Sequence, residues 1–480
     1  MPAATSKGQV VAANSQGRLA WRVIKADPVN PFETMAIKMP FKSKQLFLYY
    51  YQSAESLGIS HYQNKYDCFK SITQDPSSLR SALLLASIHY AWNHGSLSEY
   101  ESTFLAHKIE CIRAVNQHIV DASGKFFIDN MKQVATLALV EVAFGNLEQG
   151  EAHFDGLVAL MDFVYSRPES TNLSPITSEL AIRYMLTVYS FVHGMKSRVS
   201  NIMDTHWVHE PEAQLRPATP NDVGNLIHMH FRRELGEGIH SRLQLMRLIP
   251  YFFATIPKDT TPVDIDITEI LATLQQLTQL VEERMSVRST QEYQEIWNQL
   301  WMGGGIGKLS ILVVKANVHS VAGIGPTEPW AKSQGKTSSW TGWTSSSGLY
   351  LNSVLGVWNA GQPMAARTLG LILIVLNRDI EHTQDVLNSP YMPQADVWLW
   401  KVFSGAASLT RNRGVGGAAW SPRLEILQNH FEAYLRAWSK ASGTSNWQDA
   451  KSALRRVVWL DTSPHDCMVK GIWEAALRLT

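Results

Sequence analysis

The sequence predicts an all-α protein, built as a large array of packed antiparallel helices. Apolar residues recur at spacings of three and four along most of the 480 residues, which is typical of amphipathic helices. Few runs alternate with period two between turn residues, so strands are not required. Hydrophobic residues make up 45% of the chain and charged residues 18%, a composition that predicts a sizeable core and not a disordered chain.

We expect two parts in the chain. Residues 1–30 are small and polar without a sustained period, which predicts a mobile N-terminal tail. Residues 31–480 carry the helical periodicity and should form one helical domain. The helical material begins at about 45–57, where Phe47 and Tyr50 lie at helical spacing.

The first half of the helical domain shows regular boundaries between helices. Pro76 and Ser77 precede a helix that is apolar on nearly all sides, so this helix should be central. Gly145 and Asn146 separate two helices that we interpret as an αα-hairpin. The predicted helices are 79–94, 104–119, 131–144, 147–165, 177–195, 221–249 with a break near Gly236 and Gly238, and 268–285.

The second half begins with a different composition. Residues 302–348 are dense in Gly, Ser, Thr and Trp, and we interpret Gly323–Ser347 as an exposed loop or insertion. Trp340 and Trp343 should pack back onto the body. Helices are then predicted at 348–359, 364–379, about 398–409, 423–441 with Pro422 in the first turn, and 450–459.

Charge and hydropathy narrow the class of protein. Forty-three Lys and Arg face 42 Asp and Glu, whereas a protein that holds duplex DNA by itself usually carries a basic surplus. The longest apolar run, Leu369–Leu376, is too short to span a bilayer. The first residues contain no apolar stretch typical of a secretory signal, and the cysteine usage fits a reducing compartment. We therefore expect a soluble intracellular protein with no membrane span.

A glycine-rich segment, Gly303–Lys308, invites comparison with a phosphate-binding loop. That motif needs Gly where Met302 stands and Ser or Thr where Leu309 stands. A flexible joint between helices is the better interpretation.

Two pairs of closely spaced histidines are candidate zinc ligands. His228 and His230 are two apart, a spacing that puts their rings on different sides of a helix. His206 and His209 lie three apart in a Pro-rich segment, and no second pair accompanies either. We therefore assign no metal ligand and no cofactor-binding residue.

Acidic residues at two places in the sequence are candidates for a chemical role. Asp379, Glu381 and His382 follow a buried helix and could support acid–base chemistry, although a solvated helix end explains them equally well. Glu141 lies within an apolar run and should pair with an Arg or His of a neighbouring helix. No nucleophile elbow or metalloprotease helix motif occurs, so we assign no catalytic residue and expect no enzyme.

Several segments, in order, carry a family resemblance. An Asn-Pro-Phe lead and a Met-Pro step precede a Tyr-rich helix, a buried helix follows, then a helix–Gly–helix hairpin, and a Trp-plus-helix segment closes the chain. These segments are Asn30–Pro40, Leu48–Tyr51, Leu83–His89, Leu137–Leu157 and Trp447–Trp459. Together they resemble the fungal-specific transcription factor domain, the regulatory half of fungal zinc-cluster transcription factors. The resemblance implies an all-α nuclear regulator of transcription, in many members of a secondary-metabolite gene cluster, without catalytic residues.

The zinc-cluster module that precedes this domain in the family has no counterpart here. It needs six close cysteines, and the chain has Cys68, Cys111 and Cys467, far apart. Three explanations stay open: a truncated gene model, action through a DNA-binding partner, or a scaffold reused for another task. We expect a transcriptional regulator with protein partners, either a second copy or a DNA-binding protein.

The alternative is an enzyme or small-molecule-binding protein of fungal secondary metabolism on the same scaffold. A deep apolar pocket with converging polar groups, such as His89 or Glu141, would favour it. A small-molecule effector therefore stays open as well. A third interpretation is a dimerisation module.

Overall fold

The computed structural model is helical throughout its larger elements. It describes residues 35–54, 72–119, 126–165, 175–209, 220–233, 238–253, 261–286, 295–296, 299–301, 303–321, 323, 336–358, 362–388, 392–415, 421–460 and 466–478. Within this part of the chain, one antiparallel pair of two-residue strands occurs, β1 (Ile265–Asp266) with β2 (Thr337–Ser338). The all-α prediction is confirmed. The expected tail at 1–30 lies outside the described residues.

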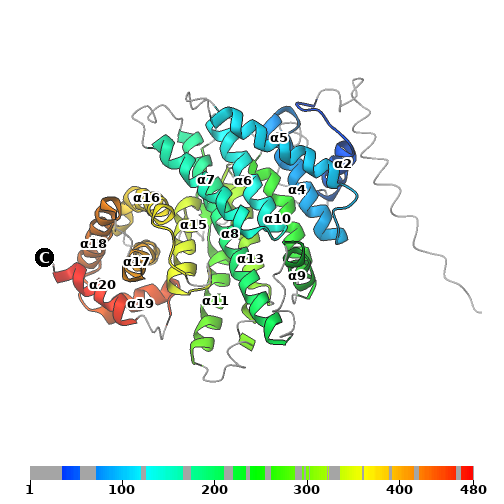
Figure 1. Ribbon diagram of the computed structural model, residues 1–480. Coiled ribbons are helices and arrows are strands. Elements are labelled where there is room, and N and C mark those ends of the chain that lie inside the picture. The colour runs from blue at the N-terminus through cyan, green and yellow to red at the C-terminus, as the bar shows by residue number, and fades with distance from the viewer. Residues whose placement is uncertain are drawn as a thin grey trace, which may run out of the picture.

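The N-terminal helices form the larger body of the molecule, drawn in blue to green (Figure 1). Helices α4, α6 and α8 pack at its centre, each against several neighbours. The helices of this body are α2 (Ser43–Ala54), α4 (Pro76–His94), α5 (Glu101–Ile119), α6 (Phe127–Ala143), α7 (Leu147–Tyr165), α8 (Pro175–His209), α9 (Pro220–Arg233), α10 (Gly238–Phe253), α11 (Thr268–Ser286) and α13 (Gly305–Val321).

The C-terminal helices form a bundle beside this body, drawn in yellow to red (Figure 1). Helix α17 is its axis, because it contacts α15, α16, α18, α19 and α20. The elements of the bundle are α15 (Trp340–Leu349), the π-helix η4 (Tyr350–Val354), α16 (Ala366–His382), the 3₁₀-helix η6 (Gln384–Asn388), α17 (Met392–Val415), α18 (Pro422–Ser442), α19 (Trp447–Val457) and α20 (Asp466–Arg478).

Helix boundaries follow the local chemistry that the sequence indicated. The carboxylate of Asp75 accepts a hydrogen bond of 2.9 Å from the backbone N–H of Ser78 and caps α4, with Pro76 in the first turn. Gly145 adopts a left-handed φ of 88° between α6 and α7, which pack together as the predicted αα-hairpin. Two separate helices, α9 up to Arg233 and α10 from Gly238, lie on either side of the break predicted near Gly236, and residues 234–237 themselves lie outside the described part.

The predicted loop at Gly323–Ser347 is wrong over its second half. Helix α15 starts at Trp340, and each of its ten residues is buried. Small Ser, Thr and Gly side chains let neighbouring helices approach α15 closely, so a composition typical of loops serves here for tight packing. Trp340 and Trp343 do pack into the interior of the molecule, with exposures of 1% and 0%. Residues 324–335 lie outside the described part.

One large apolar core runs through both halves of the molecule, and a second, smaller core cluster lies between α2 and α4. Buried residues from α4 in the body to α20 in the bundle belong to one continuous cluster. Tryptophan supplies the largest of its fully buried side chains: Trp301, Trp340, Trp343, Trp398, Trp400, Trp438 and Trp473. Among the described helices, none is both long and apolar enough to cross a membrane.

Candidate functional site

A pocket lies between the body and the bundle. Helices α8, α10 and α13 of the body form one wall, and α15 with η4 forms the other. About 50 Å³ of the pocket is open to the centres of water-sized molecules, within about 600 Å³ of space between lining atoms that includes the mouth. Most of the wall is apolar, as is usual for small-molecule sites.

One face of α15 supplies the bundle side of this pocket. Trp340, Thr344 and Ser347 of α15 line it, at spacings of four and three, and Leu351 of η4 follows them. Residues at these spacings share one side of a helix. The opposite side of α15 faces the bundle, where Trp343 stacks on Trp400 of α17 with ring centroids 4.9 Å apart. Helix α15 therefore contacts the pocket and the bundle axis at the same time.

The pocket contains buried polar atoms that have no hydrogen-bond partner within the described structure. They are Thr187 Oγ1, Thr344 Oγ1, Ser347 Oγ and Trp358 Nε1. Each of these side chains is at least nine-tenths buried, with exposures between 4% and 9%. Buried polar groups without partners are uncommon in folded proteins, because each costs about 1–3 kcal/mol. Four of the unpaired atoms among the described residues gather at this one pocket, where a ligand or water molecules can complete their hydrogen bonds. Trp343 Nε1 and Ser345 Oγ of α15 are also unpaired but do not line it.

Other polar groups at the same pocket are satisfied within the protein. Ser190 Oγ donates to the carbonyl of Leu186 at 2.8 Å, and Ser310 Oγ donates to that of Ile306 at 3.0 Å. Trp340 Nε1 donates to the carbonyl of Val313 at 2.8 Å. The unpaired atoms are thus a distinct subset of the lining.

The π-helix η4 positions Trp358. Its wide turn is closed by a backbone hydrogen bond of 2.9 Å from Leu355 N–H to the Tyr350 carbonyl. The side-chain amide of Asn352 then donates to the Trp358 carbonyl at 3.2 Å. The indole ring packs edge-on against Tyr189, with centroids 5.8 Å apart. Single π-turns occur often at functional sites, where they re-aim side chains.

The chemistry of the pocket favours binding over catalysis. Its described lining consists of Thr, Ser, Phe, Leu, Ile, Val and Trp, none of which titrates near neutral pH. General acid–base catalysis needs a titratable group within hydrogen-bond reach of the reacting atom. The described lining of the pocket supplies hydrogen bonds and apolar surface only.

The N-terminus of α15 is fixed by a second buried polar cluster. Ser339 caps the helix by accepting from Gly342 N–H at 3.0 Å, and its own hydroxyl donates to Asp379 Oδ1 at 2.5 Å. Lys401 Nζ on α17 donates to Asp379 Oδ2 at 2.7 Å. The side chains of Asp379 and Lys401 are 6% and 4% exposed. This cluster, Ser339–Asp379–Lys401, joins α15, α16 and α17, and we name it the clamp.

The structure does not assemble Asp379, Glu381 and His382 into an acid–base site. Asp379 belongs to the clamp, whereas His382 is exposed at the end of α16. Glu381 accepts hydrogen bonds from Asn377 and from the hydroxyl of Tyr434, at 2.9 Å and 3.0 Å. Burial and this bond to Glu381 raise the pKa of Tyr434. These residues are close in sequence, but successive residues of a helix point in different directions and therefore contact different neighbours.

His89 is buried at a different place in the body, with both ring nitrogens in use. Arg247 Nε can only donate, so His89 Nε2 accepts that bond, at 2.8 Å. Nδ1 then carries the proton and donates to the hydroxyl of Tyr49 at 2.9 Å. Burial and the nearby Arg247 cation lower the pKa of His89 to about 3. A neutral imidazole with no free lone pair is a structural link between α2, α4 and α10.

Glu141 is buried, as expected, and has a cationic partner. The partner is Lys108 of α5, whose Nζ lies 2.5 Å from Glu141 Oε1, and not an Arg or His. Asn146 donates to Glu141 Oε2 at 2.8 Å. Glu141, like His89, does not line the pocket.

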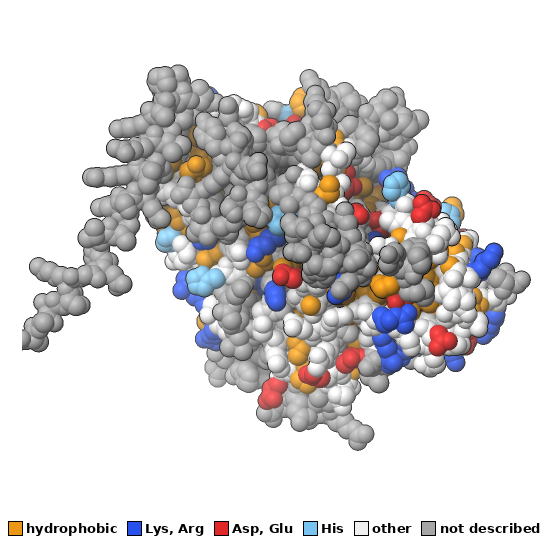
Figure 2. Space-filling view, turned by 180° about the vertical axis from the view of Figure 1, so that it is seen from behind, with side chains coloured by type: hydrophobic (Ala, Val, Ile, Leu, Met, Phe, Trp, Pro, Cys, Tyr) orange, Lys and Arg blue, Asp and Glu red, His pale blue; other side chains and the backbone are white. Residues whose placement is uncertain are grey.

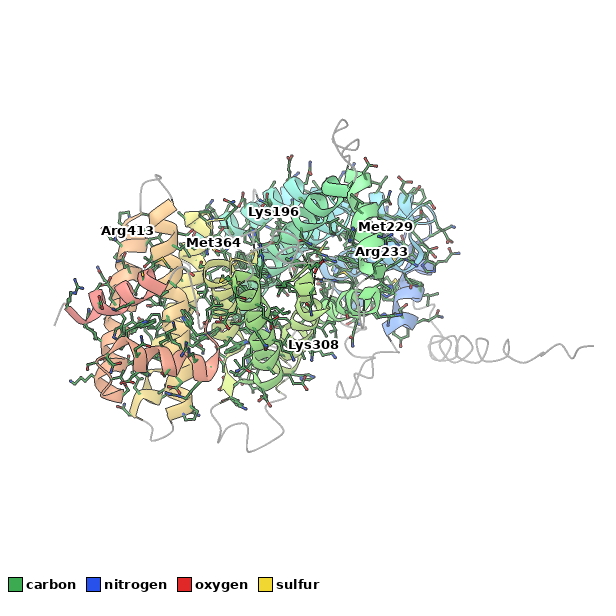
Figure 3. All side chains as sticks on the ribbon, turned by 90° about the horizontal axis from the view of Figure 1, so that it is seen from below. Lys196, Met229, Arg233, Lys308, Met364 and Arg413 are labelled. Carbon is green, nitrogen blue, oxygen red and sulfur yellow. The ribbon has the colours of Figure 1, made fainter. Side chains whose placement is uncertain are left out.

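The remaining sequence candidates are not brought together. The interpretation of Gly303–Lys308 as a joint between helices is wrong over its second part, because α13 already begins at Gly305. Lys308 is an exposed side chain of this helix (Figure 3). His228 on α9 accepts a hydrogen bond of 2.8 Å from Arg232 Nε. Met229 and Arg233, labelled in Figure 3, mark this helix at the opposite end of the molecule from Arg413. The side chains of His206 and His209 lie outside the description. Among the described residues, no group of three or more His, Cys, Asp or Glu could hold a metal ion.

The pocket residues were missed at the level of sequence because their segment was assigned to a loop. The pattern Trp340, Thr344, Ser347, Leu351 was present as a helical face and could have been found by testing that period. Trp358 carried no such signal, since its position depends on the π-turn. Comparison with protein-family models, with curated proteins and with solved structures finds no match to this chain.

Proposed function

We propose that this chain is a small-molecule-responsive regulatory protein whose ligand binds in the pocket between the body and the bundle. The observation that carries the proposal is the set of four buried, unpaired polar atoms in an otherwise apolar pocket. A ligand that completes their hydrogen bonds binds only the folded state and therefore stabilises it.

The position of α15 supports a regulatory role for ligand binding. Its pocket face holds Thr344 and Ser347, its N-terminus is held by the clamp, and Trp343 on its other side stacks on α17. The hydroxyl of Tyr350, in the π-helix that follows, also lies 3.1 Å from Thr278 Oγ1 of α11. A shift of α15 on ligand binding would change contacts in both halves of the molecule, provided that the ligand binds the two positions with different affinity.

We propose that the process regulated by the ligand is transcription in the nucleus, which the chain controls through a protein partner. The support is the ordered resemblance of the chain to the fungal transcription factor domain. The nearly neutral charge is consistent with action through a partner, and on the face shown in Figure 2 basic and acidic side chains lie interspersed. Deletion of the gene should change the transcript levels of particular genes. Unchanged transcripts together with an accumulated metabolic intermediate would favour the enzyme alternative instead.

The ligand-binding part is tested by thermal unfolding of the full chain with and without 2-pentanone, a small neutral probe. We expect the midpoint to rise with probe concentration. Ser310 lines the pocket, and its hydroxyl is used within its own helix, so Ser310→Phe should fill the pocket and abolish the rise. An equal rise in both proteins, or none in the wild type, would contradict binding at this pocket.

A further inference from the structure

We infer that the ligand of the pocket is an uncharged, mainly apolar molecule with a carbonyl-type oxygen, which accepts hydrogen bonds from Trp358 and from one of the hydroxyls of Thr344 and Ser347. The inference rests on the proposed function, namely that this pocket binds a small molecule. It adds the chemical class of the ligand and the atoms that recognise it.

The absence of ionisable side chains in the described lining selects an uncharged ligand. Moving a charge out of water costs several kcal/mol unless an opposite charge or several hydrogen bonds meet it. Arg183 of α8 is a buried cation beside the pocket, with its guanidinium 5.1 Å from the ring centroid of Trp340. A carboxylate ligand would have to compete for this group with the partners that Arg183 already has.

Those partners hold the guanidinium of Arg183 on three sides. Its Nε donates to Glu179 at 2.7 Å, and its terminal nitrogens donate to Asn317 at 2.7 Å and Ser320 at 3.1 Å. The cation is therefore neutralised and hydrogen-bonded within the protein. An anion in the pocket would gain little from it, and a cationic ligand would find no counter-charge among the described lining residues.

The donor character of the unpaired atoms selects an acceptor. The indole N–H of Trp358 can donate and cannot accept. The hydroxyls of Thr344 and Ser347 can do either, and neither proton is committed to the helix backbone. Ser346 on the same helix behaves differently, because its hydroxyl donates to the carbonyl of Gly342 at 2.8 Å. A carbonyl oxygen has two lone pairs, so it can accept from Trp358 and from one hydroxyl at once.

The size of the pocket selects a small ligand or a small end of a longer one. Its open volume of about 50 Å³ corresponds to about four water-sized spheres, at roughly 10–15 Å³ each. A carbonyl group with a few methylenes fits this space. Apolar wall and buried donors together should therefore prefer a short ketone or ester to an acid, an amine or a sugar.

The test compares three probes of similar size on the full chain. They are 2-pentanone, its hydrocarbon isostere 2-methyl-1-pentene, in which CH₂ replaces the carbonyl oxygen, and pentanoate. Dissociation constants are measured for the wild type, Thr344→Val, Ser347→Ala and the control Ser346→Ala. Thr344→Val is isosteric, and the thermal midpoint of each variant shows that it is folded.

We expect 2-pentanone to bind the wild type and pentanoate to bind at least about tenfold more weakly. At least one of Thr344→Val and Ser347→Ala should weaken 2-pentanone binding about fivefold to tenfold, the effect of about one hydrogen bond. The same variants should leave the affinity for 2-methyl-1-pentene unchanged or higher, and Ser346→Ala should leave both affinities unchanged.

Three results would overturn the inference in distinguishable ways. If both neutral probes bind and the variants change their affinities equally, the pocket is a ligand site but the carbonyl is not recognised by these hydroxyls. Binding of pentanoate equal to that of 2-pentanone would likewise reject the uncharged class alone. Binding of neither neutral probe contradicts the proposed function, and the inference with it.

Discussion

Two sets of buried polar groups lie along helix α15, and they differ in whether their hydrogen bonds are completed within the protein. At its N-terminus, in the clamp, both carboxylate oxygens of Asp379 are paired, one with Ser339 and one with Lys401. Along its pocket face, Thr344 and Ser347 are as deeply buried but have no partner within the described structure. The distance along the chain between the two sets is less than three helical turns, so local composition does not explain the difference.

The comparison separates a structural role from a binding role. A buried polar cluster whose hydrogen bonds are complete orders the helices that supply it. A buried polar cluster whose bonds are incomplete lowers the stability of the folded protein, and proteins retain such sites where function requires them. The clamp should therefore respond to substitution by losing stability, and the pocket should respond by losing ligand affinity.

The largest effect is expected from breaking the clamp. Lys401→Met leaves the carboxylate of Asp379 buried without its counter-charge, which should lower the free energy of unfolding by about 3–5 kcal/mol. The measurement is the urea midpoint, with Lys308→Met as control, because Lys308 is exposed and its loss should change stability by less than about 0.5 kcal/mol. Adding Asp379→Leu to Lys401→Met should restore most of the loss. A single-variant loss below about 1 kcal/mol would show that the clamp is not a structural element.

His89 is a second buried group with complete hydrogen bonds, and its contribution to stability can be measured as a function of pH. Its pKa falls from 6.5 to about 3 on folding, so the unfolded chain takes up the proton first as pH decreases. The stability contributed by neutral His89 is complete above about pH 6.5 and is lost as pH falls towards 3. Between pH 7 and pH 4 the loss should be about 3 kcal/mol.

Urea unfolding at several pH values measures this contribution against His89→Gln, which cannot titrate. The variant should show a shallower decrease in stability over the same range. Some dependence should remain, because burial also lowers the pKa of His107, to about 4. Parallel pH profiles for the two proteins would mean that His89 is not held neutral.

Gly342 tests how closely the clamp is packed. A Cβ at this position would lie 2.1 Å from Asp379 Oδ2, so Gly342→Ala must displace the carboxylate. The expected loss is about 2 kcal/mol, typical of overpacking. Gly370→Ala is the matched control within α16, since its Cβ would meet Leu424 at an ordinary 3.7 Å. It should be neutral or stabilising by up to about 1 kcal/mol. Equal effects of the two substitutions would contradict close packing at the clamp.

The smallest effect has the opposite sign and comes from the pocket. Thr344→Val removes an unpaired hydroxyl and keeps the side-chain shape, so the ligand-free protein should gain about 1 kcal/mol. Ser346→Ala removes a paired hydroxyl two residues away in the same helix and should give no such gain. A loss of stability in Thr344→Val would show that its hydroxyl has a partner in the free protein.

The sequence predicts the helical class well, because periodicity and caps are local properties. Pro76, Gly145 and Pro422 all lie where the predicted boundaries require them. The pocket could not be predicted in the same way. The segment of α15 has the composition of a loop, and its helical state depends on tertiary packing around small side chains. The direction of Trp358 depends on a π-turn, for which the sequence carries no simple period.

The sequence also failed to predict which polar side chains lie together, for a related physical reason. Asp379, Glu381 and His382 are adjacent in sequence, yet the helix directs Asp379 to Lys401 and Glu381 to Tyr434. Thr187 and Thr344, far apart in sequence, line one pocket. Which polar groups converge is decided by helix packing, and proximity along the chain does not report it.

The most direct test of the account is the indole N–H resonance of Trp358 in the ¹⁵N-labelled full chain, assigned by comparison with Trp358→Phe. In the free protein this N–H has no partner among the described residues, so its proton should resonate at the high-field end of the indole range. Saturation with 2-pentanone should move it downfield as a hydrogen bond forms, whereas 2-methyl-1-pentene should not. A resonance that is already at a hydrogen-bonded position, or that stays fixed at saturating ketone, would contradict the claim that the unpaired atoms of this pocket recognise a ligand.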